Sequence, residues 1–274
     1  MHVQPYRHLT RNYFFYRFMI ALLMGIMSGY AMASDTCKSL VATGNPEYPP
    51  YLWRDPEDET RLIGANADLM QLLAKELGVA IDVKYAGTWA RVQEEAKLGR
   101  IDLIAGAFFT VPRLEYMDYF YPAFRETRSV IWTRSNVNLN YKKWADLMGK
   151  QGTTVINNSF GEEFDRYAKN NLKISTVPSL EQALKMLTRS RSDYLIYEED
   201  PGLAFAAKMN IRGIKTISPA ISNESLHLTF SHKSACNNGE MRGRIAKAIY
   251  KLTRQNSMNA LIETNIQLWR KQTK

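Results

Sequence analysis

The chain from residue 40 to residue 105 alternates between strand-like and helix-like patterns, and this alternation most constrains the fold. Three short runs of apolar and β-branched residues are typical of buried strands: residues 40–43, 79–83 and 101–105. Two longer runs with apolar residues at three-to-four spacing are typical of helices: residues 66–77, ended by Gly78, and 88–98, ended by Gly99. This order of elements predicts an α/β domain with a mostly parallel sheet.

A second α/β block begins after residue 128. Its predicted strands are residues 130–132, 153–156 and 193–197, and its predicted helices are residues 160–169 and one opened by the capping box of residues 179–182. A strand over residues 226–230 and a helical tail from about Glu240 end the chain. The proline-rich residues 44–51 predict an irregular loop.

The N-terminal residues have the order of a secretory signal peptide. Arg7, Arg11 and Arg17 occur without any acidic residue, an apolar run covers residues 18–27, and Ala-Met-Ala ends at Ala33. An uncleaved membrane anchor is the alternative, but the run is shorter than the roughly 20 residues that a spanning helix needs. We expect residues 1–33 to be cleaved and the mature protein to reach the periplasm.

The two cysteines, Cys37 and Cys236, predict a disulfide bond, because an exported protein folds in an oxidising compartment. Their spacing matches no C-x-x-C redox or zinc motif. A bridge would place the start of the mature chain and its C-terminal region in the same lobe. Two unpaired buried thiols are the alternative.

The charge pattern and the missing motifs exclude several classes of function. The formal net charge is +9, but the basic residues are spread along the chain, which argues against a nucleic-acid partner. Neither an H-E-x-x-H nor a G-x-S-x-G motif is present, and no glycine-rich phosphate loop opens a helix. With only His227 and His232 left after cleavage, we expect no metal site, no cofactor and no enzymatic activity.

Two charged residues follow predicted strands, at the edge where open α/β sheets bind ligands. Arg113 comes after the strand of residues 101–105, and its planar guanidinium suits a carboxylate. Glu198 comes directly after the strand of residues 193–197 and suits an ammonium group. Each residue taken alone could instead be an ordinary solvated surface residue.

Four segments in order resemble family 3 of the extracellular solute-binding proteins, the amino-acid-binding components of ABC importers. They read GANADLMQLLAKELGV, GRIDLIAGAFFTVPR, YFYPAF and SDYLIYEE. The resemblance implies two α/β lobes, each a mostly parallel sheet flanked by helices, joined by a two-strand hinge. It places lobe 1 at residues 34–127 and 223–274 and lobe 2 at residues 128–222.

The resemblance also assigns ligand-binding roles. It implies that Arg113 binds an α-carboxylate, Glu198 binds an α-ammonium, and Tyr48 and Trp89 enclose the ligand side chain. The other residues that it places at the ligand are Ser159, Gly106, Ala107, Phe108 and Thr110. Trp89 as a core residue and Tyr48 as packing for the proline loop are the alternatives.

This sequence departs from the family pattern at several of these positions. Asn158-Ser159-Phe160 replaces G-T-T, Glu198 replaces a shorter aspartate, and Gly106, Ala107 and Phe108 replace a serine-rich strand. The resemblance implies a monomeric periplasmic protein that closes over an amino acid or similar zwitterion and delivers it to an inner-membrane ABC permease. The alternatives are an enzyme similar to cyclohexadienyl dehydratases, with Glu198 as the acid, and a ligand-sensing partner of a membrane receptor.

Overall fold

The fold is given by a computed structural model, which describes Met1 and residues 37–272. Apart from Met1, the predicted signal peptide of residues 1–33 lies outside the described residues. Residues Cys37–Lys274 form one unit. No helix in the described part of the chain is long and apolar enough to cross a membrane.

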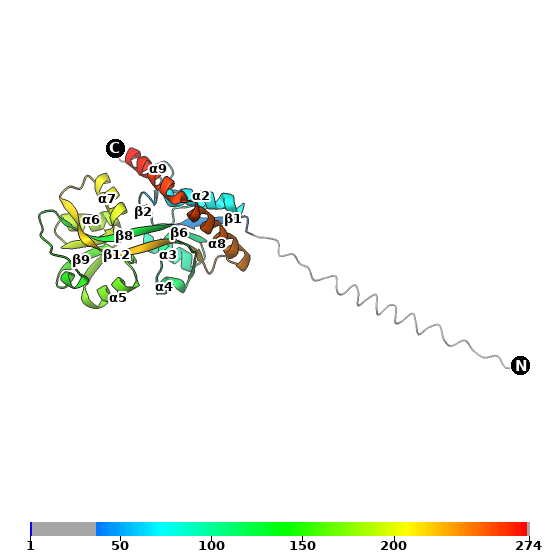
Figure 1. The fold of residues 1–274 in the computed structure, drawn as a ribbon, viewed down its shortest axis with the longest axis horizontal. Helices are drawn as coiled ribbons and strands as arrows, with labels where there is room; N and C mark the ends of the chain where they lie inside the picture. The colour runs from blue at the N-terminus through cyan, green and yellow to red at the C-terminus, as the bar shows by residue number, and fades with distance from the viewer. Residues whose placement is uncertain (2–36, 273–274) are drawn as a thin grey trace. The chain divides into compact units, whose positions relative to one another are not determined.

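A nine-stranded sheet with strand order β10-β9-β11-β8-β12-β6-β1-β5 forms the centre of this unit, and β7 pairs with β12. Its strands are β1 (Ser39–Thr43), β5 (Ala80–Val83), β6 (Leu103–Phe108), β7 (Met117–Tyr119), β8 (Arg125–Arg134), β9 (Gln151–Val155), β10 (Lys173–Val177), β11 (Tyr194–Glu198) and β12 (Ile214–Ser231). The long antiparallel strands β8 and β12 lie side by side in the middle of the sheet (Figure 1). They connect two groups of parallel strands.

The first lobe surrounds the parallel strands β5, β1 and β6. Its helices are α2 (Ala65–Leu77), α3 (Trp89–Lys97), α4 (Val111–Leu114), α8 (Gly239–Arg254) and α9 (Ser257–Gln272), with α8 and α9 packed against α2. A separate small sheet contains β2 (Glu47–Tyr48), β3 (Leu52–Arg54) and β4 (Leu62–Ile63). The predicted helices and strands of residues 40–105 are all present.

The second lobe surrounds the parallel strands β10, β9 and β11. Its helices are the 3-10 helix η1 (Trp144–Leu147), α5 (Glu162–Asn171), α6 (Leu180–Thr188) and α7 (Glu199–Lys208). Ser179 begins α6 as predicted, because its hydroxyl accepts a hydrogen bond from the amide of Gln182. The two-lobed α/β fold is confirmed. The lobe limits at residues 128 and 222 stay predictions.

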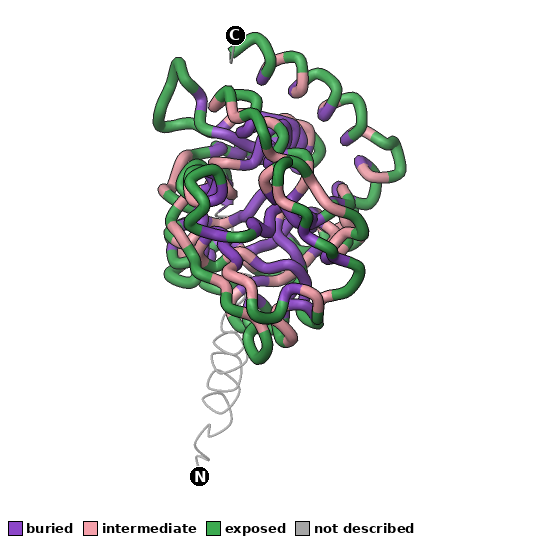
Figure 2. Tube along the Cα trace, turned by 90° about the vertical axis from the view of Figure 1, so that its left-hand side faces the viewer, coloured by how far each residue is buried: buried purple, intermediate pink, exposed green. Residues whose placement is uncertain are grey.

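Strand β11 shows why the strands that reach the lobe interface are almost wholly apolar. All five of its residues are buried, and alternate side chains point to opposite faces of the sheet. Tyr194 and Ile196 pack in one core cluster, whereas Leu195 and Tyr197 pack in another. Figure 2 shows the buried residues concentrated along the strands inside the molecule.

Three local predictions are corrected by the structure. The proline-rich segment is not wholly irregular, since its residues Glu47–Tyr48 pair with β3 as strand β2. Strand β6 does not end at residue 105 but continues to Phe108, because Ala107 and Phe108 pair with β12. Glu198 is the last residue of β11 rather than the first residue beyond it, and α7 follows it directly.

The predicted disulfide bond is present between Cys37 and Cys236, whose Cα atoms lie 5.5 Å apart. Cys37 precedes β1, and Cys236 lies between β12 and α8. The bridge therefore joins the segment before β1 to the C-terminal region of the chain within the first lobe, as the sequence predicted.

Candidate functional site

The candidate site is a cavity at the carboxyl ends of strands from both lobes. Arg113 lies in the short helix α4, which follows β6, and Glu198 ends β11. Both residues line the same cavity, together with Tyr48 from β2 and Trp89 from the start of α3. A cation and a carboxylate that are far apart in the sequence thus face one enclosed space.

The guanidinium of Arg113 is buried but has no ion pair with any described residue. Its Nη1 donates to the carbonyl oxygen of Phe108 at 2.9 Å, and its Nη2 donates to that of Asn157 at 3.4 Å. Its carbon Cζ lies 5.3 Å from the ring centre of Trp89, a cation–π distance. Carbonyl oxygens and an aromatic face hold the guanidinium in place without neutralising its charge.

The carboxyl group of Glu198 is the matching buried acid, with only 2% of the residue exposed. Burial raises the pKa of Glu198 from 4.5 to about 7, although its own backbone amide and the charge of Arg113 act to lower it. Its Oε2 has no hydrogen-bond partner among the described residues. Such a carboxylate gains stability from any cation that reaches it.

Four buried polar atoms around this cavity have no hydrogen-bond partner in the described part of the chain. They are Tyr48 Oη, Asn66 Oδ1, Asn158 Nδ2 and Glu198 Oε2. Buried polar atoms are nearly always hydrogen-bonded in native proteins, so a cluster of unpartnered ones at one cavity requires an explanation. A polar ligand in the cavity would supply the partners.

Gly106 allows Asn66 to reach this site. The amide nitrogen of Asn66 donates to the carbonyl oxygen of Ala105 at 2.6 Å. A Cβ atom on Gly106 would lie only 2.8 Å from that nitrogen, and the φ angle of Gly106 is +122°, which a side chain rarely tolerates. Glycine at this position keeps the amide of Asn66 against the strand.

The lobes are closed over the cavity. The carbonyl oxygen of Asn157 in the second lobe accepts hydrogen bonds from Trp89 Nε1 at 3.2 Å and Gln93 Nε2 at 3.3 Å in the first. On the other side, Glu47 Oε2 accepts the amide of Leu180 at 2.8 Å. The cavity has a volume of about 20 Å³, room for about one water molecule. A larger ligand therefore requires the lobes to close around it at a somewhat wider spacing than they have here.

The structure brings seven of the nine predicted ligand-binding residues to this cavity: Arg113, Glu198, Tyr48, Trp89, Gly106, Ala107 and Phe108. Ser159 and Thr110 line an adjacent cleft instead. The hydroxyl of Ser159 donates to Asp165, and helix α5 begins only at Glu162. Thr110 is the residue before α4, where its carbonyl oxygen accepts the amide of Arg113.

Ala105, which begins the segment 105–110 that the resemblance places at the ligand, also lines the cavity. Sequence reasoning missed five further lining residues: Asn45, Leu52, Asn66, Asn158 and Leu226. Asn66 and Asn158 carried a usable signal, because each is a polar residue next to a predicted strand or helix end. Leu52 and Leu226 carried none, since apolar residues are common in strands. The described residues contain no group of three or more His, Cys, Asp or Glu side chains that could hold a metal ion.

The sequence profile of the bacterial extracellular solute-binding proteins, family 3, matches residues 40–267. The chain belongs to this family. No curated protein sequence matches this family 3 member.

Solved structures similar to this family 3 protein have the two-lobed periplasmic-binding-protein fold. A mutant of the arginine-binding protein from T. maritima is 19% identical with a TM-score of 0.70, covering 84% of this chain and 96% of that one. An amino acid ABC transporter substrate-binding protein from Streptococcus pneumoniae, bound to L-arginine, is 19% identical with a TM-score of 0.69, covering 85% and 96%. A histidine kinase sensor domain is 18% identical with a TM-score of 0.71, covering 84% and 97%.

Proposed function

We propose that this protein binds an amino acid or a similar small zwitterion between its lobes and delivers it to an ABC permease in the inner membrane. The proposal rests on one observation: two buried charged residues line the same cavity. Arg113 is a cation without an ion pair, and Glu198 is a carboxylate. The cleavage of residues 1–33, the periplasmic location and the monomeric state belong to the same proposal.

The polar atoms of the cavity match the two ends of a zwitterion. Arg113 and the Nδ2 atom of Asn158 are donors for a carboxylate, and bidentate pairing to a guanidinium fixes its orientation. Glu198 and the Oδ1 atom of Asn66 are acceptors for an ammonium group. Tyr48 and Trp89 would enclose the remainder of the ligand.

Differential affinity explains how such a ligand would close the lobes. Arg113 belongs to the first lobe and Glu198 to the second, so a zwitterion contacts both only in the closed state. A ligand shifts a conformational equilibrium only as far as its affinities for the two states differ. Strands β8 and β12 would act as the hinge, and the permease would bind the closed form.

The expected result of a thermal-shift screen with the twenty amino acids is a raised melting temperature that depends on pH. A ligand at about 100 times its dissociation constant stabilises the native state by about 2.7 kcal/mol. Because burial raises the pKa of Glu198 to about 7, the acid is charged at pH 8 but protonated at pH 5. Affinity should fall about 100-fold between these pH values.

Each melting temperature must be compared with that of the ligand-free protein at the same pH. The raised pKa of Glu198 makes the free energy of unfolding of the ligand-free protein fall as the pH rises from 4.5 to about 7. Glu198→Gln is the control, and its ligand-induced shift should be small and nearly independent of pH. If no amino acid raises the melting temperature, the binding of a standard amino acid is refuted. An equal shift at both pH values would refute the role of Glu198.

An enzyme is the second candidate, favoured by the same carboxyl group. A buried acid whose pKa is about 7 is suited to protonate a leaving group near neutral pH. Arg113 would then hold the carboxylate of a substrate similar to those of cyclohexadienyl dehydratases. An enzyme would consume such a substrate, whereas a binding protein would not. The Glu198→Gln variant should lose this activity. A sensing role would use the same closed form, and neighbouring genes for a sensor kinase would indicate it.

A further inference from the structure

The cavity contains one positive and one negative side chain among its lining residues. Arg113 is the cation and Glu198 is the acid. The α-carboxylate and the α-ammonium of a zwitterion would engage both of them. A ligand with a third charge would therefore have no oppositely charged side chain left at the cavity.

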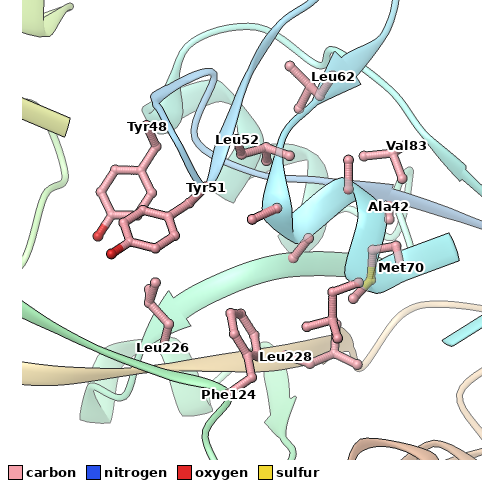
Figure 3. Close-up of a cluster of buried hydrophobic side chains, with 14 of the residues drawn as sticks. Ala42, Tyr48, Tyr51, Leu52, Leu62, Met70, Val83, Phe124, Leu226 and Leu228 are labelled. Atoms are coloured by element: carbon pink, nitrogen blue, oxygen red, sulfur yellow. The ribbon is translucent and has the colours of Figure 1, made fainter. Parts of the chain in front are cut away.

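The rest of the cavity wall is mainly apolar. Leu52 and Leu226 are 1% and 3% exposed, and Phe108 and Ala105 are also buried. Figure 3 shows that Leu52 and Leu226 come from different elements, and Tyr48 lines the same cavity. Burying an unpaired charge against such a wall costs several kcal/mol, whereas an uncharged side chain of matching size gains from the contact.

Carboxylates near the lobe interface do not supply the missing charge. Glu47 accepts the amide of Leu180, Asp165 accepts the hydroxyl of Ser159 and the amide of Phe160, and Asp200 accepts the hydroxyl of Tyr51. None of these three carboxylates lines the cavity. Recruiting Glu47 or Asp200 for a cationic side chain would break a bond between the lobes. Recruiting Asp165 would break its bonds within the second lobe.

We propose that the ligand is a zwitterion with a small uncharged side chain, and that the site discriminates against arginine, lysine and glutamate. The proposal rests on the proposed function and goes beyond it by naming the side-chain class. It separates this protein from the structurally similar substrate-binding protein that is bound to L-arginine.

Calorimetric titration of the mature protein at pH 8 tests this selectivity. The probes are L-alanine, L-serine, L-valine and L-leucine against L-arginine, L-lysine and L-glutamate. At least one uncharged probe should bind at least about 100-fold more tightly than every charged probe, because a buried unpaired charge is strongly unfavourable. A charged probe that binds as tightly as the best uncharged one overturns the selectivity and leaves the proposed function standing. If none of the seven probes binds, the selectivity proposal fails, and the screen of all twenty amino acids decides the proposed function.

A matched pair of variants tests the cause of the selectivity. Leu226→Asp places a carboxylate in the apolar wall, and Leu226→Asn adds a side chain of the same size without the charge. The aspartate variant should bind L-arginine or L-lysine at least about tenfold more tightly than the asparagine variant. Equal affinities in two folded variants contradict the charge argument. If either variant fails to fold by circular dichroism, the wild-type titrations alone decide.

Discussion

Replacing Arg113 by alanine should abolish ligand binding while the protein still folds. The guanidinium is the only positive side chain at the cavity among the described residues, so its removal leaves a bound carboxylate buried without a counter-charge. Such losses typically amount to about 3 to 5 kcal/mol, or more than 100-fold in affinity. Calorimetric titration with the amino acid that binds the wild type most tightly measures the effect.

The fold should tolerate this substitution, because the carbonyl oxygen of Phe108 keeps a second donor. The hydroxyl of Tyr119 donates to the same oxygen at 2.7 Å. Arg113→Lys should bind with intermediate affinity, since it retains the charge without the planar fork. Arg91→Ala is the matched control, because Arg91 is exposed and pairs with Glu95 on α3. Unchanged affinity in a folded Arg113→Ala variant would show that the residue does not bind the ligand.

Removing the disulfide bond should cause the largest loss of stability. The bridge between Cys37 and Cys236 spans 199 residues, and the chain-entropy account gives about 5 kcal/mol for a loop of that size. Native disulfides typically contribute about 2 to 5 kcal/mol. The double variant Cys37→Ala, Cys236→Ala should therefore unfold at a lower urea concentration than the oxidised wild type.

Ligand affinity should remain unchanged in the same variant, because the bridge and the site lie at opposite ends of β1. Cys37 precedes the amino end of this strand, whereas Asn45 follows its carboxyl end and lines the cavity. A reducing agent should destabilise the wild type and leave the variant unaffected. Equal unfolding midpoints, or two titratable thiols in the unfolded wild type, would contradict the account.

Much of the fold could be predicted because local patterns agree with the tertiary structure. Leu69, Leu73 and Leu77 are buried on one face of α2, and Gly78 ends that helix in the left-handed conformation. Elements set by long-range pairing could not be predicted in full. The extension of β6 to Phe108 depends on β12, whose polar stretch around Ser222 has no apolar alternation and is ordered by pairing with β8.

Helix α7 was missed for a related reason. It contains Pro201 and Gly202, and its apolar residues do not form a single face. Gly202 packs against Trp132, where a Cβ atom would lie only 2.3 Å from the indole ring. Glycine occupies position 202 because the helix backbone lies so close to β8 that no side chain fits there. Helix propensity does not explain this residue.

The candidate site was predictable where a charged residue follows a strand. Arg113 and Glu198 were found because open α/β sheets bind ligands at the ends of their strands and because the family resemblance assigned these residues roles. The contributions of Asn66 and Asn158 depend on which of their amide atoms lack partners in the folded chain. A local pattern can mark these residues as polar groups near the ends of elements, but which of their atoms lack partners is determined only in the folded chain.

The most direct test of the central claim is the crystal structure of the protein with the amino acid that stabilises it most in the thermal-shift screen. The account predicts that the ligand carboxylate lies about 2.7 to 2.9 Å from the guanidinium nitrogens of Arg113. The ligand ammonium should lie at a similar distance from Glu198, with the side chain against Leu52 and Leu226. A ligand bound outside this cavity, or bound in it without contact to Arg113, would contradict the account.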